Sequence, residues 1–187
     1  MSPQRHGSTD SVDPREALLR GRVRDVPDFP KPGILFRDLT PLMGDGVAMR
    51  MCVDMLAERI VRHRPEVIVA IESRGFIFGA PTATALGVAF APVRKPGKLP
   101  YRTRRRSYAL EYGTDALEMH ADAVLEGARV VLVDDLLATG GTAAAAMGLV
   151  EEQGARVVGA AFVVELGLLN GRHRLPNVPV DALIRYD

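Results

Sequence analysis

Apolar runs and helical patterns alternate through the second half of the chain. The apolar runs do not alternate with polar residues, which is typical of strands buried on both faces of a parallel sheet. They are "VIVAI" (67–71), "VAFAPVRK" (88–95), "RVVLVDD" (129–135), "RVVGAAFVVE" (156–165) and "VDALIRYD" (180–187). Helical patterns lie between them over 76–87 and 142–154, each followed or closed by a glycine. This order predicts an α/β fold, a parallel sheet with helices on both faces.

The first half of the chain is less regular. Residues 1–12 are polar and are expected to form a disordered tail. Asp13 and Pro14 favour a helix start, and a second helix is expected from about 47 to 64. Between them, spaced prolines at 27, 30 and 32 favour an extended, semi-rigid segment over a long helix or a central strand.

Two further segments bear on the later argument. Residues 95–107 are expected to form a basic loop, followed by a weakly alternating antiparallel pair joined around Gly113 and Thr114. Pro81 is awkward in the helix predicted over 76–87 unless it lies in the first turn.

Length, charge and cysteine content narrow the class of protein. With 187 residues and 47% hydrophobic composition, residues 13–187 are expected to form a single domain with a full core. The formal net charge is +1, which gives no global reason to expect a nucleic-acid partner. The longest apolar run is far shorter than the roughly 20 residues of a membrane span. A single cysteine, Cys52, fits a reducing compartment, so a cytoplasmic protein is predicted.

The stretch "VLVDDLLATGGTA" (131–143) carries the clearest chemical signal. Two acids, Asp134 and Asp135, stand at the end of a predicted strand, where ligands gather in parallel sheets. A glycine turn and a helix start follow, and free backbone N–H groups at a helix start bind phosphate. Adjacent carboxylates accept hydrogen bonds from neighbouring sugar hydroxyls. The combination favours a ribose 5-phosphate site.

A plainer interpretation is a tight turn between a strand and a helix. For a Gly-Gly-Thr alone that interpretation would be preferred, but the paired acids shift the balance towards a ligand site. The chain contains no Walker-type phosphate loop and no dinucleotide-binding glycine motif. It also has no His/Cys cluster with zinc spacing, and no protein-held metal is expected.

The stretch "VVLVDDLLATGGTA" resembles the phosphoribosyl pyrophosphate (PRPP) signature of type I phosphoribosyltransferases. The resemblance implies a Rossmann-like parallel-sheet core with a small hood, here about 26–43, and a flexible antiparallel loop. It implies that Asp134 and Asp135 hold the ribose hydroxyls. The implied 5-phosphate loop consists of Ala138, Thr139, Gly140, Gly141 and Thr142. It further implies a homodimer, and Mg²⁺ bound mainly through PRPP and pyrophosphate.

Four further segments are similar to the adenine phosphoribosyltransferase branch of that family: "DFPKPGILFRDLTPL", "ESRGFIFGAP", "RKPGKLP" and "SYALEYG". By resemblance, Phe36 stacks on the base, Leu136 covers its other face, and the backbone of Leu35 and Arg37 reads the adenine edge. Without the resemblance, "GILF" would be taken as an apolar strand in the core.

Proton transfer is assigned to Glu111 by the same resemblance. Branches that act on 6-oxopurines typically carry an acid at the position of Ala138, which has no ionisable group here. Glu111 in "LEYG" matches the catalytic glutamate and would lie near adenine N7. Its alternative interpretation is a glutamate on the outer face of a strand.

The pyrophosphate site is likewise assigned by resemblance. Its members are Ser73, Arg74, Arg94, Lys95 and Lys98. A cis bond between Glu72 and Ser73 is implied, and Glu72 is expected to act through its backbone. Residues 94–106 contain seven basic residues and no acid. They form either a solvated loop or a lid over PRPP, and Arg104–Arg106 are interpreted as solvated.

The predicted reaction joins adenine and PRPP to give AMP and pyrophosphate, with no nucleic-acid or membrane partner. The alternative is a PRPP-binding regulatory protein on the same fold. A regulator would need a surface that reads DNA or RNA, and residues 1–12 are too short for a helix-turn-helix domain.

Overall fold

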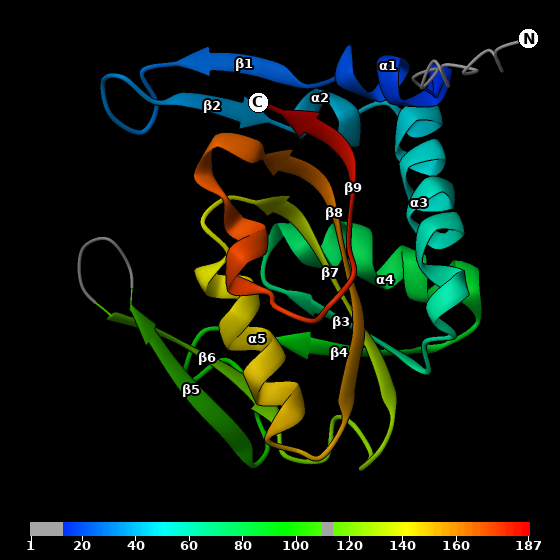
Figure 1. Ribbon diagram of the computed structural model, residues 1–187, viewed down its shortest axis with the longest axis vertical. Helices are drawn as coiled ribbons and strands as arrows, with labels where there is room; N and C mark the ends of the chain where they lie inside the picture. Colours follow the sequence, from blue (N-terminus) through cyan, green and yellow to red (C-terminus); the bar gives the residue numbers. More distant parts are fainter. Residues whose placement is uncertain (1–12, 110–113) are drawn as a thin grey trace, which may run out of the picture. The chain divides into compact units, whose positions relative to one another are not determined.

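The computed structural model describes residues 13–109 and 114–187, and the chain forms two compact units. The first unit ends at Met49 and the second comprises Arg50–Asp187. Figure 1 shows the elements of both. The second unit holds the central sheet and the candidate site.

The proline-rich segment of the first unit folds into a short antiparallel ribbon. Strand β1 (Arg24–Pro27) pairs with β2 (Leu35–Asp38), and α2 (Thr40–Met43) follows. Helix α1 (Pro14–Arg20) precedes the ribbon, and its first turn is capped by Asp13, whose carboxylate accepts a hydrogen bond from the Arg15 N–H at 2.9 Å. As expected from the prolines, the segment contains no long helix and no central strand.

The second unit is built on a five-stranded sheet in which all neighbouring strands are parallel. Its spatial order is β4-β3-β7-β8-β9. The strands are β3 (Val67–Ile71), β4 (Ala89–Val93), β7 (Arg129–Leu137), β8 (Arg156–Leu166) and β9 (Val180–Tyr186). The predicted α/β class and the parallel sheet are therefore confirmed.

Two helices cover opposite faces of this sheet (Figure 1). Helix α4 (Arg74–Leu86) connects β3 to β4, and α5 (Gly141–Glu151) connects β7 to β8. The two connections run in opposite directions from the middle of the sheet, and right-handed crossovers then place their helices on different faces. Helix α4 begins at Arg74, so Pro81 lies in its interior, the position that the sequence marks as awkward for a proline.

The remaining helical elements join the sheet strands. Helix α3 (Gly46–Ile60) crosses the boundary between the units and leads into the 3₁₀ turn η1 (Val61–His63). Two more 3₁₀ turns, η2 (Gly167–Leu169) and η3 (Gly171–Arg174), connect β8 to β9. Cys52 on α3 is buried, and burial raises the pKa of its thiol to about 12. No helix among the described residues could span a membrane.

The basic segment, residues 95–107, was predicted to be a loop throughout, but its second part forms a strand. Strand β5 (Thr103–Ala109) already begins at Thr103 and pairs antiparallel with β6 (Thr114–His120). In this strand Arg106 lies opposite the buried Leu117, and its guanidinium covers Gly148 of α5 and forms an ion pair with Glu152. Arg106 is exposed, in line with its interpretation as solvated, and its guanidinium also contacts α5. The joining residues 110–113 lie outside the described part.

The main core lies between the sheet and α5. It includes Val69 and Ile71 of β3, Leu117 and Met119 of β6, and a set of small and aliphatic side chains from α5. The alanine-rich face of α5 allows this close approach. The other face is equally tight, since a Cβ on Gly79 of α4 would meet the Ala70 side chain at 2.5 Å. Strands β3 and β7 pair directly in this sheet, which places their carboxyl ends side by side.

Candidate functional site

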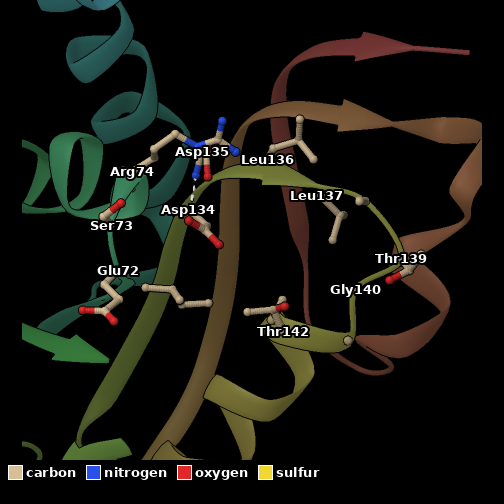
Figure 2. A pocket seen from close by; sticks show the side chains of 14 residues that line it. Glu72, Ser73, Arg74, Asp134, Asp135, Leu136, Leu137, Thr139, Gly140 and Thr142 are labelled. Carbon is tan, nitrogen blue, oxygen red and sulfur yellow. Dashed lines mark hydrogen bonds and ion pairs between the residues drawn. The ribbon is translucent and has the colours of Figure 1, made fainter. Parts of the chain in front are cut away.

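A pocket of about 400 Å³ opens where β3 and β7 end. Figure 2 shows its two walls, one from the residues that follow β3 and one from the end of β7 and the start of α5. The lining residues are Ile71, Glu72, Ser73, Arg74 and the continuous segment 134–143. The structure therefore brings the acid pair, the glycine turn, Leu136, Ser73 and Arg74 together around one cavity.

The glycine turn begins at Ala138, as expected, but the strand before it is longer than expected. Strand β7 continues through both acids to Leu137, and α5 starts at Gly141. Gly140 caps this helix with φ +79°, a left-handed conformation that L side chains rarely adopt. The first N–H groups of a helix have no partner within the helix and carry partial positive charge. Residues 138–142 thus offer backbone donors and the Thr139 and Thr142 hydroxyls to an anion.

The acid pair is held by one hydrogen bond and one ion pair. The Asp135 N–H donates to Asp134 Oδ1 at 3.0 Å, and Arg74 Nε lies 2.8 Å from Asp135 Oδ2. Gly75 leaves the space that Asp134 occupies, since a Cβ there would overlap its carboxylate. Burial raises the pKa of both carboxyls, and the neighbouring Asp135 carboxylate raises that of Asp134 further. Burying two carboxylates at a pocket wall is unfavourable unless they are hydrogen-bonded, so both are well placed to accept hydrogen bonds from a polyhydroxyl ligand.

Glu72 organises the basic side chains beside the pocket. Its side chain is 6% exposed, and it accepts hydrogen bonds from Arg94 Nε at 2.6 Å and from the Lys95 N–H at 2.9 Å. Lys98 Nζ lies 3.5 Å from the same carboxylate. Burial opposes ionisation of Glu72, but these donors outweigh it and lower the carboxyl pKa. Glu72 thus holds the charged groups of Arg94 and Lys98, two of the cations assigned to pyrophosphate, and the backbone of Lys95, a third.

The side-chain role of Glu72 was missed, because only a backbone role was expected. The Glu72–Ser73 peptide bond is cis, as the resemblance implied. A sequence signal for the side chain did exist: residues 94–106 hold seven cations and no acid, so a compensating acid had to come from another segment.

A second network, also missed, ties Lys95 to the phosphate end of the pocket. Lys95 Nζ forms an ion pair with Asp115 and donates to the Tyr108 hydroxyl at 3.2 Å. The Tyr108 hydroxyl donates to Asp115 Oδ2 at 3.2 Å and accepts from Thr142 Oγ1 at 3.4 Å. The β5–β6 hairpin is thereby linked to the first turn of α5. Nothing in the sequence pattern singles out Asp115 or Tyr108 for this contact.

The residues assigned to the base are not all on this pocket's walls. Leu136 lines it, whereas Leu35, Phe36 and Arg37 belong to the first unit, on β2. Within that unit Phe36 meets Phe29 edge to face, with ring centroids 5.1 Å apart, and Arg37 forms an ion pair with Asp25. Glu111 lies outside the described residues.

Among the described residues, no three His, Cys, Asp or Glu side chains are grouped to hold a metal ion. The carboxylate oxygens of Asp134 and Asp135 at the pocket wall are hard ligands of the kind Mg²⁺ takes. Two such groups fit an ion that arrives with its phosphate ligand and keeps most of its contacts to that ligand and to water.

Residues 44–178 match the phosphoribosyl transferase domain family. An adenine phosphoribosyltransferase of Synechococcus sp. is 56% identical over 169 residues, which span 90% of this chain and 99% of the relative. One from Desulfitobacterium hafniense is 54% identical over 164 residues, spanning 88% and 95% of the two chains.

Solved structures agree with the sequence relatives. The crystal structure of adenine phosphoribosyltransferase from Thermoanaerobacter pseudethanolicus superimposes with a TM-score of 0.89 at 50% identity, covering 91% of this chain and 99% of that one. The enzyme from Saccharomyces cerevisiae, solved with an imino-altritol bisphosphate and adenine, gives 0.85 at 42% identity and covers 90% and 98% of the two chains.

Proposed function

This chain belongs to the adenine phosphoribosyltransferase family, and on that premise we propose that it transfers the phosphoribosyl group of PRPP to adenine, releasing AMP and pyrophosphate. The observation that carries the proposal is the joint placement of the acid pair, the glycine turn and Arg74 around one pocket. A sugar that bears a phosphate at one end and a pyrophosphate at the other matches that order of groups.

The 5-phosphate is assigned to residues 138–142. Their N–H groups and two threonine hydroxyls favour an anion, and the positive end of the α5 dipole adds to the attraction. The ribose hydroxyls are assigned to Asp134 and Asp135, which precede the turn on the same strand. Because both segments are continuous in the chain, the sugar and its phosphate are oriented together.

The pyrophosphate is assigned to Ser73, Arg74, Arg94, Lys95 and Lys98. Glu72 holds the side chains of Arg94 and Lys98 and the backbone N–H of Lys95. A guanidinium presents a planar fork of donors to phosphate oxygens. Donors held in place before the reaction stabilise the charge that builds up on the leaving group. Arg74 must exchange or share its Asp135 contact to serve in this way.

The bond to adenine N9 forms at the anomeric carbon as the pyrophosphate departs, and the sugar gains oxocarbenium character. No covalent intermediate with the protein is needed, so positioning and exclusion of water supply most of the rate. Glu111 is proposed to handle the proton near adenine N7. Phe36 and Leu136 are proposed to sandwich the base, with the backbone of Leu35 and Arg37 at its edge.

Magnesium is the proposed cofactor, and Asp134 and Asp135 are the protein groups that would hold it beside its phosphate ligands. When bound, it would neutralise charge on PRPP and on the leaving pyrophosphate. A homodimer and a cytoplasmic location are proposed from the family resemblance and from the single buried cysteine. Light scattering of the purified protein tests the dimer.

The activity is tested with a panel of bases: adenine, hypoxanthine, guanine and orotate, each with PRPP and Mg²⁺, while pyrophosphate release is followed. Of the four bases, we expect only adenine to give pyrophosphate release. Release that prefers a 6-oxopurine would overturn the base assignment. PRPP binding without release on any base would favour the regulatory alternative.

A further inference from the structure

The phosphate loop, residues 138–142, rests against a second turn that the proposed reaction does not use. A Cβ placed on Gly171 of η3 would overlap the Ala138 carbonyl oxygen and approach Leu137 Cδ1 to 2.9 Å. In return, a Cβ on Gly140 would overlap the Gly171 carbonyl. Two glycine backbones therefore lie in direct contact behind the loop. Neither position has room for a side chain.

This second turn is held firmly in place. Glu165, 3% exposed, stands on β8 opposite Leu137 of β7 and forms two bonds of 2.6 Å with Arg172 of η3. The Arg172 guanidinium also donates to the Val180 carbonyl at the start of β9 at 2.7 Å. Leu175, just after η3, is buried in the same core cluster as Leu137. The turn is thus fixed to β8, β9 and the core.

From these contacts we infer that Gly171 is a positioning residue for the phosphate loop, and that the Glu165–Arg172 pair holds Gly171 in place. The inference rests on the proposed function, because it takes the loop to bind the 5-phosphate of PRPP. Gly171 touches the loop from behind, so it sets the position of Ala138 and Gly140 without contacting the ligand. The pyrophosphate end, around Glu72, has no contact with this turn in the described structure.

The test compares Gly171→Ala with Gly167→Ala. Alanine suits the backbone at both sites, because neither glycine has a positive φ. At Gly171 the added methyl meets the loop backbone, which cannot rotate away. At Gly167 it meets the mobile ends of Asp187 and Arg185, with Asp187 Oδ1 at 2.6 Å. The two variants therefore add the same methyl group to the same segment and differ in whether it reaches the phosphate loop.

For Gly171→Ala we expect the KM for PRPP and the Kd for AMP to rise about tenfold or more, since a displacement of about 1 Å costs as much in a pre-organised site. The Kd for pyrophosphate and the KM for adenine should stay within about twofold of wild type. Gly167→Ala should match wild type in all four. Equal losses of AMP and pyrophosphate binding, or normal AMP binding, would overturn the inference.

A second variant, which adds no atoms, keeps the inference testable if Gly171→Ala fails to fold. Arg172→Lys keeps the charge but loses the planar fork to Glu165, so a smaller rise in the Kd for AMP is expected, about threefold, again without a change for pyrophosphate. An unchanged AMP affinity here, together with an unfolded Gly171→Ala, would count against the inference. Calorimetry with ribose 5-phosphate separates the positioning role of Gly171 from the proposed function. If the wild-type protein makes no AMP, the proposed function fails. Selective loss of ribose 5-phosphate binding in Gly171→Ala would still support the positioning role.

Discussion

The two ends of the pocket bind anions by different means. At the phosphate end, residues 138–142 offer backbone N–H groups and hydroxyls, with no charged side chain in the loop. At the other end the groups are long cationic side chains, and each is already engaged: Arg74 with Asp135, Arg94 and Lys98 with Glu72, and Lys95 with Asp115. One end is a shaped backbone surface and the other a set of ion pairs.

This difference matches the proposed fate of the two groups. The 5-phosphate stays with the product, so a fixed backbone cradle serves substrate and AMP alike. The pyrophosphate leaves, and side chains that have protein partners to return to can release it. Acidic partners also keep the cations in place while the pocket is empty, which reduces the ordering cost when the ligand binds.

The largest expected effect belongs to neither end. Glu111→Gln should lower turnover by at least about 10², because a positioned acid–base group contributes about 10²–10⁴. PRPP affinity should barely change, since both anion sites are intact. Steady-state AMP formation and PRPP calorimetry measure the two quantities. Turnover equal to wild type would remove Glu111 from the mechanism.

Next in size is the acid pair between the two ends. Asp134→Asn combined with Asp135→Asn should weaken PRPP binding by at least about tenfold, because amides are poorer acceptors for ribose hydroxyls than carboxylates. Pyrophosphate alone should bind as in wild type or more tightly, since Arg74 loses its anionic partner. Asp122→Asn, on the exposed surface, is the control. Full PRPP affinity in the double variant would count against the ribose assignment.

A change at the cationic end should alter pyrophosphate binding without altering phosphate binding by residues 138–142. Glu72→Gln removes the charge that holds Arg94 and Lys98, and we expect the Kd for pyrophosphate to change about fivefold, towards weaker binding, while the Kd for AMP is constant. Glu66→Gln, on an exposed glutamate paired with Arg129, serves as the matched control. Parallel shifts for AMP and pyrophosphate would show that the two ends are not independent.

The smallest effect concerns stability. Burial and the Asp135 charge raise the pKa of Asp134, so the folded state binds a proton more tightly than the unfolded state. Ionisation of Asp134 then lowers the stability of the folded state, and this cost grows as the pH rises above the ordinary aspartate pKa of 3.8 towards the raised pKa of the folded state. Asp134→Asn removes it, and the unliganded protein should melt about 2–4 °C higher at pH 8. Thermal unfolding at pH 5 and pH 8 checks this, because the gain should shrink at pH 5.

Much of the site is local in the chain and was predictable. Strand β7, the acid pair, the glycine turn and α5 follow one another without interruption, and their patterns depend on near neighbours: apolar runs, a positive φ at Gly140 and a helix start. The placement of Ser73 and Arg74 beside this segment was implied only by the family resemblance, and the structure brings them together at the paired ends of β3 and β7. Propensity did not foresee that Thr103–Ser107 form a strand, because pairing with β6 outweighs the charge of its arginines.

By itself, then, the sequence determined the parallel sheet, the acid pair, the glycine turn and the cations needed nearby. Each of these features lies within one short stretch of the chain that has its own periodicity or turn chemistry. Only the tertiary structure decided which partners hold those groups: the Glu72 carboxylate on Arg94, Asp115 on Lys95, and Gly171 behind Gly140. These contacts join residues that lie about 20 to 30 positions apart in the sequence. Such pairs leave no local pattern, since their geometry exists only after the sheet and its crossovers have formed.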